Sequence, residues 1–183
     1  MQPQAEQLTD EQIAVLVQGG DFDVFAQLVE RYEPKLTRYA NRFLLSNECE
    51  DLLQDVFIKA FSNIQSFDTE RKFSSWIYRI AHNEFINAIR KKQRFSFPLL
   101  ELDTVFPHPV AKETAERETL SNEAKERLEK ALGEIDPKYR EVLVLYYIEE
   151  MGYNEIADIL HIPTSTVGVR LSRAKQQLKT VLT

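Results

Sequence analysis

Residues 153–178 hold the most specific local pattern in the chain. A short helix from about Tyr153 to Leu160, a tight turn through Pro163 and a second helix from about Thr164 predict a helix-turn-helix. In that motif the second helix is held rigidly enough to enter a DNA major groove. The predicted base- and phosphate-contacting residues on this helix are Thr164, Ser165, Gly168, Val169, Arg170, Ser172, Arg173 and Lys175. The alternative for this segment alone is a helical hairpin with a solvated basic face.

Residue types that support catalysis or metal binding occur without a matching pattern. His82, His108 and His161 do not cluster at metal-ligand spacing, and Cys49 has no histidine near it in the sequence. Asp158 and His161 could share a helix face, but a metal site needs further ligands. Neither a P-loop nor a dinucleotide-binding glycine pattern occurs. The sequence therefore predicts a protein that is not an enzyme and needs no cofactor or metal.

The charge is unevenly distributed, although the net charge of the 183 residues is −6. Residues 71–94 carry seven Lys or Arg against one acid, and residues 164–183 carry four and no acid. Between them, residues 96–123 carry six acids against two bases. Because the local field steers a phosphate backbone, two basic patches separated by an acidic stretch favour a nucleic-acid partner.

The elements that would position these residues are helices, because apolar residues recur at 3–4 spacing and strand-like alternation is scarce. We expect an all-α protein made of two small helical domains joined by an extended linker. The predicted boundaries are residues 1–95, a linker at 96–120 that contains three prolines, and residues 121–183.

Helix ends are marked by local signals. Thr9 and Gln12 form a predicted capping box, and a glycine pair at 19–20 ends that first helix. Asp136 followed by a proline predicts another helix start. Further expectations are a second helix capped by Asp21 and kinked or split at Pro34, a third beginning at Ser46, a fourth from Phe73 to about Lys92, and a helical period returning from about Ser121.

Two strings resemble a known family. EDLLQDVFIKAF and SFDTERKFSSWIYRIAHNEFINAIRKK, at 50–61 and 66–92, resemble the second conserved region of extracytoplasmic-function (ECF) sigma factors in the sigma-70 family. Residues 137–175 resemble their fourth region. The resemblance covers about residues 8–182. It implies a factor that binds the RNA polymerase core and directs promoter-specific initiation, reading the −10 element with region 2 and the −35 element with region 4.

The resemblance also implies roles for individual residues. Asp51, Gln54 and Asp55 match the surface that grips the clamp helices of the polymerase's largest subunit, and an acidic face suits a basic partner helix. On charge alone, the same face would be a solvated one. The −10 element is read as a single strand with a flipped-out base, and the matching residues are Ser66, Phe67, Asp68, Arg79, Asn83, Arg90, Lys91 and Lys92.

In region 4, Gly168, Val169, Ser172 and Arg173 fall where the family reads the −35 element. Arg173 could contact a guanine and Val169 a thymine methyl. The chain departs from the family at Gly168 and Val169, so the preferred sequence stays open. Implied partners are promoter DNA, the flap of the second-largest polymerase subunit and an anti-sigma factor.

The single cysteine and the absence of a signal peptide or of an apolar run near 20 residues predict a cytoplasmic protein. One rival interpretation is a free-standing helix-turn-helix regulator with residues 1–95 as a sensor or dimerisation module. Such a regulator would shift duplex DNA by itself, whereas a sigma factor recognises promoters within the polymerase complex.

Overall fold

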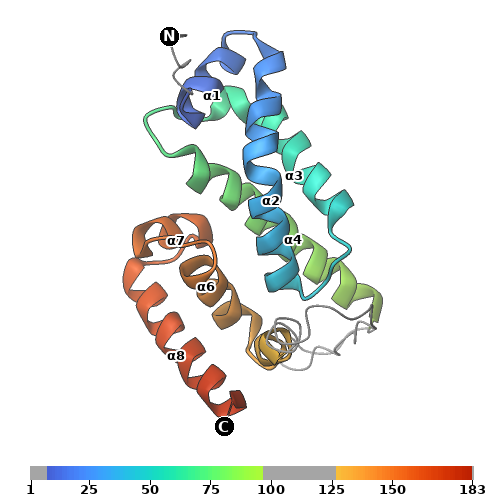
Figure 1. The fold of residues 1–183 in the computed structure, drawn as a ribbon, viewed down its shortest axis with the longest axis vertical. Coiled ribbons are helices and arrows are strands. Elements are labelled where there is room, and N and C mark those ends of the chain that lie inside the picture. The colour runs from blue at the N-terminus through green and yellow to red at the C-terminus, as the bar shows by residue number, and fades with distance from the viewer. Residues whose placement is uncertain (1–7, 97–126, 183) are drawn as a thin grey trace, which may run out of the picture.

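The computed structural model describes residues 8–96 and 127–182, and their side chains over 8–91 and 127–181. The described residues contain helices and no strand, so the all-α prediction is confirmed (Figure 1). The helices of the first half, residues 8–96, are α1 (Asp10–Gln18), the 3₁₀ turn η1 (Phe22–Val24), α2 (Phe25–Leu44), α3 (Glu50–Asn63), the 3₁₀ turn η2 (Ile64–Ser66) and α4 (Phe73–Ser96). We call this part the N-terminal module.

The C-terminal module comprises residues 127–182. Residues 127–133 are helical, and α6 (Pro137–Tyr147), α7 (Tyr153–Leu160) and α8 (Thr164–Leu182) follow. The predicted linker at 96–120 and the helix start near Ser121 lie outside the described residues, apart from the last residue of α4. No helix in the two described stretches is long and apolar enough to cross a membrane.

Local signals set several helix ends as predicted. Thr9 and Gln12 form the capping box, with the Thr9 N–H donating to the Gln12 side chain at 2.8 Å and the Gln12 N–H donating to Thr9 Oγ1 at 3.2 Å. Gly20 then takes φ +102, which an L side chain rarely adopts. Asp136 caps α6 by accepting the Lys138 N–H at 3.0 Å.

Three predicted boundaries were wrong. Pro34 does not split α2, which runs unbroken from Phe25 to Leu44. Burial of its apolar stripe outweighs the local cost of proline. Ser46 does not begin α3; its hydroxyl accepts the Glu48 N–H at 3.2 Å in the preceding turn, and the helix begins at Glu50. The Asp21 side chain makes no capping bond, and a 3₁₀ turn separates it from α2.

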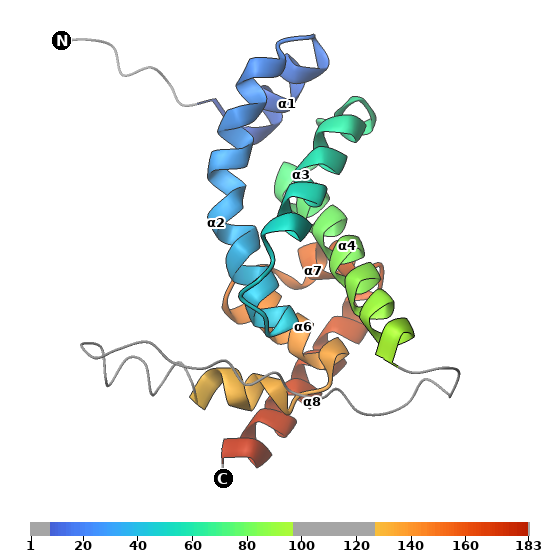
Figure 2. The same cartoon turned by 90° about the vertical axis from the view of Figure 1, so that its right-hand side faces the viewer.

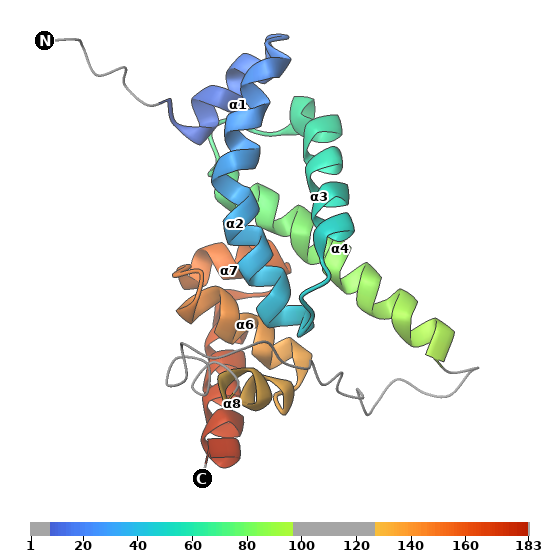
Figure 3. The same cartoon turned by 45° about the vertical axis from the view of Figure 1, so that its right-hand side comes forward.

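Aromatic side chains fill the core of the N-terminal module between α2 and α4. The Tyr39 ring lies 5.4 Å from that of Tyr78 and 5.1 Å from that of Phe85, measured between centroids. Helix α3 crosses α4 on the side away from the C-terminal module (Figure 3). The core therefore fixes the orientation of α4, and α3 leaves the opposite side of α4 uncovered.

The C-terminal module takes up that face. Helix α7 packs against α4 and α6 packs against α2, and the views in Figures 1 and 2 agree on this arrangement. Helix α8 lies along α6 on the far side. The two modules thus form one body in which the apolar cluster is continuous from α1 to α8.

Candidate nucleic-acid and protein interfaces

The helix-turn-helix is built as the sequence predicts. His161 ends α7 in the left-handed conformation at φ 52, which a histidine tolerates better than most side chains. The Ile162 N–H donates to the Ala157 carbonyl at 3.1 Å, so the turn folds tightly back on α7. Val167 and Leu171 of α8 are buried against this scaffold. The second helix is therefore held rigidly, as major-groove reading requires.

The outer face of α8 is open to solvent. The side chains of Thr164, Ser165, Val169, Ser172, Arg173 and Lys175 are exposed, while Gly168 and Arg170 are partly exposed. A methyl group on Gly168 would meet only the Tyr153 ring, at an ordinary contact distance of 3.6 Å. The predicted reading residues thus share one accessible surface, and packing within the described part of the chain does not require the glycine.

A tyrosine that the sequence did not indicate orients one of these residues. The Arg173 guanidinium donates to the Tyr139 hydroxyl at 2.9 Å and lies over its ring, 5.9 Å from the centroid. Lys175 lies over the Tyr147 ring, 5.4 Å from its centroid, and a hydrogen bond with that hydroxyl raises the pKa of the lysine. Contacts from α6 to α8 follow no sequence period, so no local signal could have found them.

The end of η2 and the loop after it contain the predicted base-binding residues Ser66, Phe67 and Asp68, and these differ in exposure. Ser66 and Asp68 are exposed, whereas Phe67 is only 5% exposed. The Phe67 ring packs 5.4 Å from that of Phe73 and 5.1 Å from that of Trp76. The Phe67 ring thus belongs to the core in this structure, and its stacking on an extruded base stays a prediction.

Helix α1 holds this loop in place, which sequence reasoning missed. The Gln18 amide donates to the carbonyls of Ile64 at 2.8 Å and Phe67 at 2.9 Å, and Gln65 returns a bond to the Gln18 carbonyl at 3.2 Å. At the other end of the loop, the Glu11 carboxylate accepts the Phe73 N–H at 3.0 Å. The backbone between η2 and α4 is therefore fixed from α1 at both ends.

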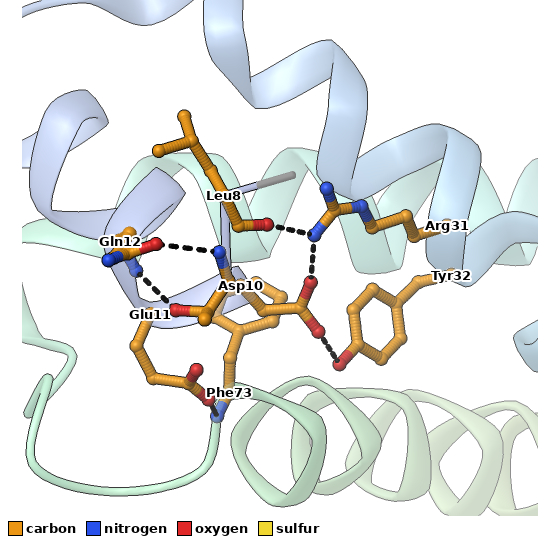
Figure 4. A network of polar contacts seen from close by, with 8 residues as sticks. Leu8, Asp10, Glu11, Gln12, Arg31, Tyr32 and Phe73 are labelled. Atoms are coloured by element: carbon orange, nitrogen blue, oxygen red, sulfur yellow. Dashed lines mark hydrogen bonds and ion pairs between the residues drawn. The ribbon is translucent and has the colours of Figure 1, made fainter. Parts of the chain in front are cut away.

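The start of α1 is itself tied to α2, as Figure 4 shows. Asp10 accepts bonds from Arg31 at 2.7 Å and from the Tyr32 hydroxyl at 2.6 Å. Burial, with the Asp10 hydrogen bond second, raises the pKa of Tyr32 far above its ordinary value, so this hydroxyl stays a donor. The same view shows Glu11 reaching the first residue of α4.

The cations of α4 are not equally accessible. Asn83, Arg90 and Lys91 are exposed, and the Lys92 side chain lies outside the described residues. Arg79, one turn before Asn83, instead contacts Asp158 of α7 at 2.5 Å, and its Nε is buried without a hydrogen-bond partner. One of the predicted phosphate-binding side chains is thus already paired with a carboxylate of the C-terminal module.

The outer face of α3 presents the predicted protein-binding residues. Asp51, Gln54 and Asp55 are all exposed. They continue into two exposed apolar side chains, Ile58 at 62% and Phe61 at 40%. A face that combines carboxylates with exposed apolar groups is suited to a protein partner more than to solvent alone.

Over the described side chains, no group of three or more His, Cys, Asp or Glu residues could hold a metal ion.

Residues 28–95 match the family model described as Sigma-70 region 2, and residues 125–178 match that described as Sigma-70, region 4. The chain is 38% identical over 170 residues to the ECF RNA polymerase sigma factor SigW of Bacillus subtilis (strain 168), covering 89% of this chain and 91% of that protein. It is 33% identical to the ECF RNA polymerase sigma-E factor of Haemophilus influenzae, over 96% of each chain.

Two solved structures are similar in fold over both modules at once. The structure of CnrH in complex with the cytosolic domain of CnrY superposes with a TM-score of 0.71 at 28% identity, covering 94% of this chain and 96% of that one. The sigma factor RpoE in complex with the anti-sigma factor NepR from Bartonella quintana superposes with a TM-score of 0.65 at 25% identity, covering 86% and 96%. Each superposition covers residues of both modules.

Proposed function

This chain belongs to the ECF sigma factors of the sigma-70 family, and from that membership we propose how its residues divide the work of promoter recognition. It binds the RNA polymerase core and directs promoter-specific transcription initiation, as a factor without enzymatic activity. The observation that carries this function is the order of two sigma regions along one chain whose relatives align over nearly its full length.

Polymerase binding is assigned to the outer face of α3. Asp51, Gln54 and Asp55 would contact the clamp helices of the largest subunit, with Ile58 and Phe61 supplying apolar contact. The exposure of all five side chains supports this assignment. Carboxylates at the rim of such a contact would speed association and orient the partner helix.

Recognition of the −10 strand is assigned to the loop after η2 and to α4. Ser66, Asp68 and Asn83 would hydrogen-bond to an extruded base, and the cations Arg79, Arg90, Lys91 and Lys92 would hold phosphates. Phe67 supports the loop from beneath, because its ring is packed in the core.

Recognition of the −35 element is assigned to the outer face of α8. Arg173 would reach a guanine edge and Val169 a thymine methyl, while Arg170 and Lys175 would contact phosphates. Support comes from the rigid turn before α8 and from the accessibility of this face. The predicted domain at residues 1–95 would thus serve the −10 element and polymerase, and that at residues 121–183 the −35 element.

A further partner and a location follow from the relatives. We propose that an anti-sigma factor binds this chain, because both similar solved structures contain a partner chain and one is named an anti-sigma factor. We also place the chain in the cytoplasm, where the polymerase core acts.

Run-off transcription with purified core polymerase on a random promoter library tests the function. Asp51→Lys with Asp55→Lys should abolish transcription and core binding, whereas Glu33→Lys with Lys35→Glu rearranges charge on exposed positions of α2 and should not. Failure of the unaltered chain to associate with core polymerase would overturn the assignment.

A further inference from the structure

The outer face of α8 carries a stripe of short side chains. Ser165, Gly168, Val169 and Ser172 recur at three- and four-residue spacing, so they lie on one side of the helix. All are exposed except Gly168, which is partly exposed. A helix with its side chains is about 10–12 Å across, close to the roughly 12 Å width of the major groove. With this stripe turned to the groove, the α8 backbone would come nearer to the base edges than that of a helix with long side chains.

Gly168 costs this helix stability, and packing does not require it. Its backbone is helical, and glycine is disfavoured relative to alanine inside a helix. Among the described residues, the Tyr153 ring is the only group outside α8 that would come within 4 Å of a Cβ there, at an ordinary contact distance of 3.6 Å. A glycine that neither backbone geometry nor packing requires is typical of a place where another molecule closely approaches the backbone.

The Tyr153 side chain comes from α7 and reaches the same place. Its ring is 40% exposed and lies edge to face with that of Tyr146, 5.5 Å away between centroids. The start of α7 is bound to the start of α8, because Thr164 Oγ1 donates to Asn154 Oδ1 at 3.3 Å. The ring is therefore held beside Gly168, although the sequence did not indicate Tyr153 as a DNA-binding residue.

The groups around Gly168 suit an apolar ligand atom. Val169, next to it in the chain, is 52% exposed, and the Tyr153 ring is the second apolar neighbour. A phosphate oxygen would find no free backbone donor at this position, because the N–H of the fifth residue of a helix donates within the helix. In the major groove, the apolar group that a base pair presents is the C5 methyl of thymine.

We propose that Gly168, Val169 and the Tyr153 ring together seat the methyl group of one thymine of the −35 element, which makes Tyr153 a specificity-determining residue for promoter choice. This rests on the proposed function, which assigns the outer face of α8 to the −35 element. A Cβ on residue 168 would stand where the base methyl lies. The atom that would stabilise α8 would thus oppose DNA binding.

The test exchanges methyl groups between protein and DNA. The full-length chain with core polymerase first selects its promoter from a random library. Each −35 thymine, on either strand, is then replaced in turn by deoxyuridine, which lacks only the C5 methyl. Affinities for these duplexes are measured with the unaltered chain, Gly168→Ala, Tyr153→Ala and Tyr153→Phe. The ratio of affinities for the thymine and deoxyuridine promoters cancels any effect of a variant on core binding or on the −10 element.

At one position, the unaltered chain should bind the thymine promoter about fourfold more tightly than the deoxyuridine promoter, as expected for one buried methyl group. Gly168→Ala should bind the thymine promoter roughly tenfold more weakly than the unaltered chain does, a loss comparable to that from a mismatched base pair. It should also prefer deoxyuridine, because the new Cβ fills the space that the missing base methyl leaves. Tyr153→Ala should bring the ratio toward one, whereas Tyr153→Phe keeps the ring and should leave the ratio unchanged.

A thymine preference that survives unchanged in Gly168→Ala would overturn the inference, and so would equal ratios for Tyr153→Ala and Tyr153→Phe. If Tyr153→Ala does not fold, the reversed preference of Gly168→Ala decides by itself, because that change is expected to stabilise α8. A holoenzyme that selects a −35 element but is indifferent to its thymine methyl groups refutes only this inference. A chain that does not bind core polymerase refutes the proposed function and this inference with it.

Discussion

The same substitution at two glycines should change stability in opposite directions. Gly168 lies inside α8 with an ordinary helical backbone, and a Cβ there would meet only the Tyr153 ring at 3.6 Å. Gly20 follows α1 with φ +102, and a Cβ there would meet nothing within 4 Å. The space around the new methyl group therefore permits both changes, and only the backbone conformation separates them.

The magnitudes follow from that difference. Alanine is favoured over glycine inside a helix by about 0.8–1.0 kcal/mol, so Gly168→Ala should raise the free energy of unfolding by about 1 kcal/mol. That corresponds to about a fivefold smaller unfolding constant and a midpoint about 2–4 °C higher. An L side chain at Gly20 would be held in left-handed backbone, which costs about 1–2 kcal/mol. The two variants should thus differ by about 2–3 kcal/mol.

Urea denaturation measures both effects. The single tryptophan, Trp76, reports on the N-terminal module, and far-UV circular dichroism reports on all helices. We expect Gly20→Ala to lower the fluorescence midpoint and Gly168→Ala to raise the dichroism midpoint, with unchanged slopes. A destabilised Gly168→Ala would mean that the Tyr153 contact is tighter than ordinary packing, and a neutral Gly20→Ala would refute the backbone argument.

Gln18→Ala should reduce the discrimination between a preferred −10 element and a base-substituted one in run-off transcription, because the amide fixes two loop carbonyls. Gln12→Ala removes one of the two bonds of the capping box of the same helix and should leave that ratio unchanged, so equal losses would contradict a role in positioning. Tyr139→Phe removes only the acceptor for Arg173 and should lower −35 selectivity by up to about fivefold at an unchanged unfolding midpoint; unchanged selectivity on substituted −35 duplexes would refute it. The hydrogen bond from Lys72, 2.8 Å away, lowers the pKa of Glu155 in the folded chain, so the contribution of this ion pair to the contact between the two modules is present above the ordinary value of 4.5 and is lost as pH falls through the lowered value. Scattering should show expansion on acidification below pH 4.5, and constant dimensions would count against an ionic interface.

Periodic and local features of the fold could be predicted from the sequence. The start of α1 at a capping box, the start of α6 at Asp136 and the His161 turn each depend on residues within four positions of one another. Such signals failed where packing overrode them, as in the passage of α2 through Pro34. There, burial of a continuous apolar stripe outweighed a local preference.

The candidate site divides in the same way. The exposed face of α8 and the outer face of α3 follow helical spacing, so the amino-acid pattern alone was enough to indicate them. The packing of the loop after η2 could not be predicted from helical spacing. Phe67 belongs to an aromatic core assembled from α4, and Gln18 reaches the loop from 46 residues earlier in the chain.

By itself, the sequence determined the helices, the helix-turn-helix and the family, because these depend on spacing along one chain. Only the tertiary structure decided which cationic side chains form ion pairs with carboxylates of the other module. Arg79 and Asp158, or Arg38 and Glu149, are far apart in the sequence, and no period relates them. Their pairing depends on how two packed modules meet, a free-energy balance of burial and charge that local patterns do not encode.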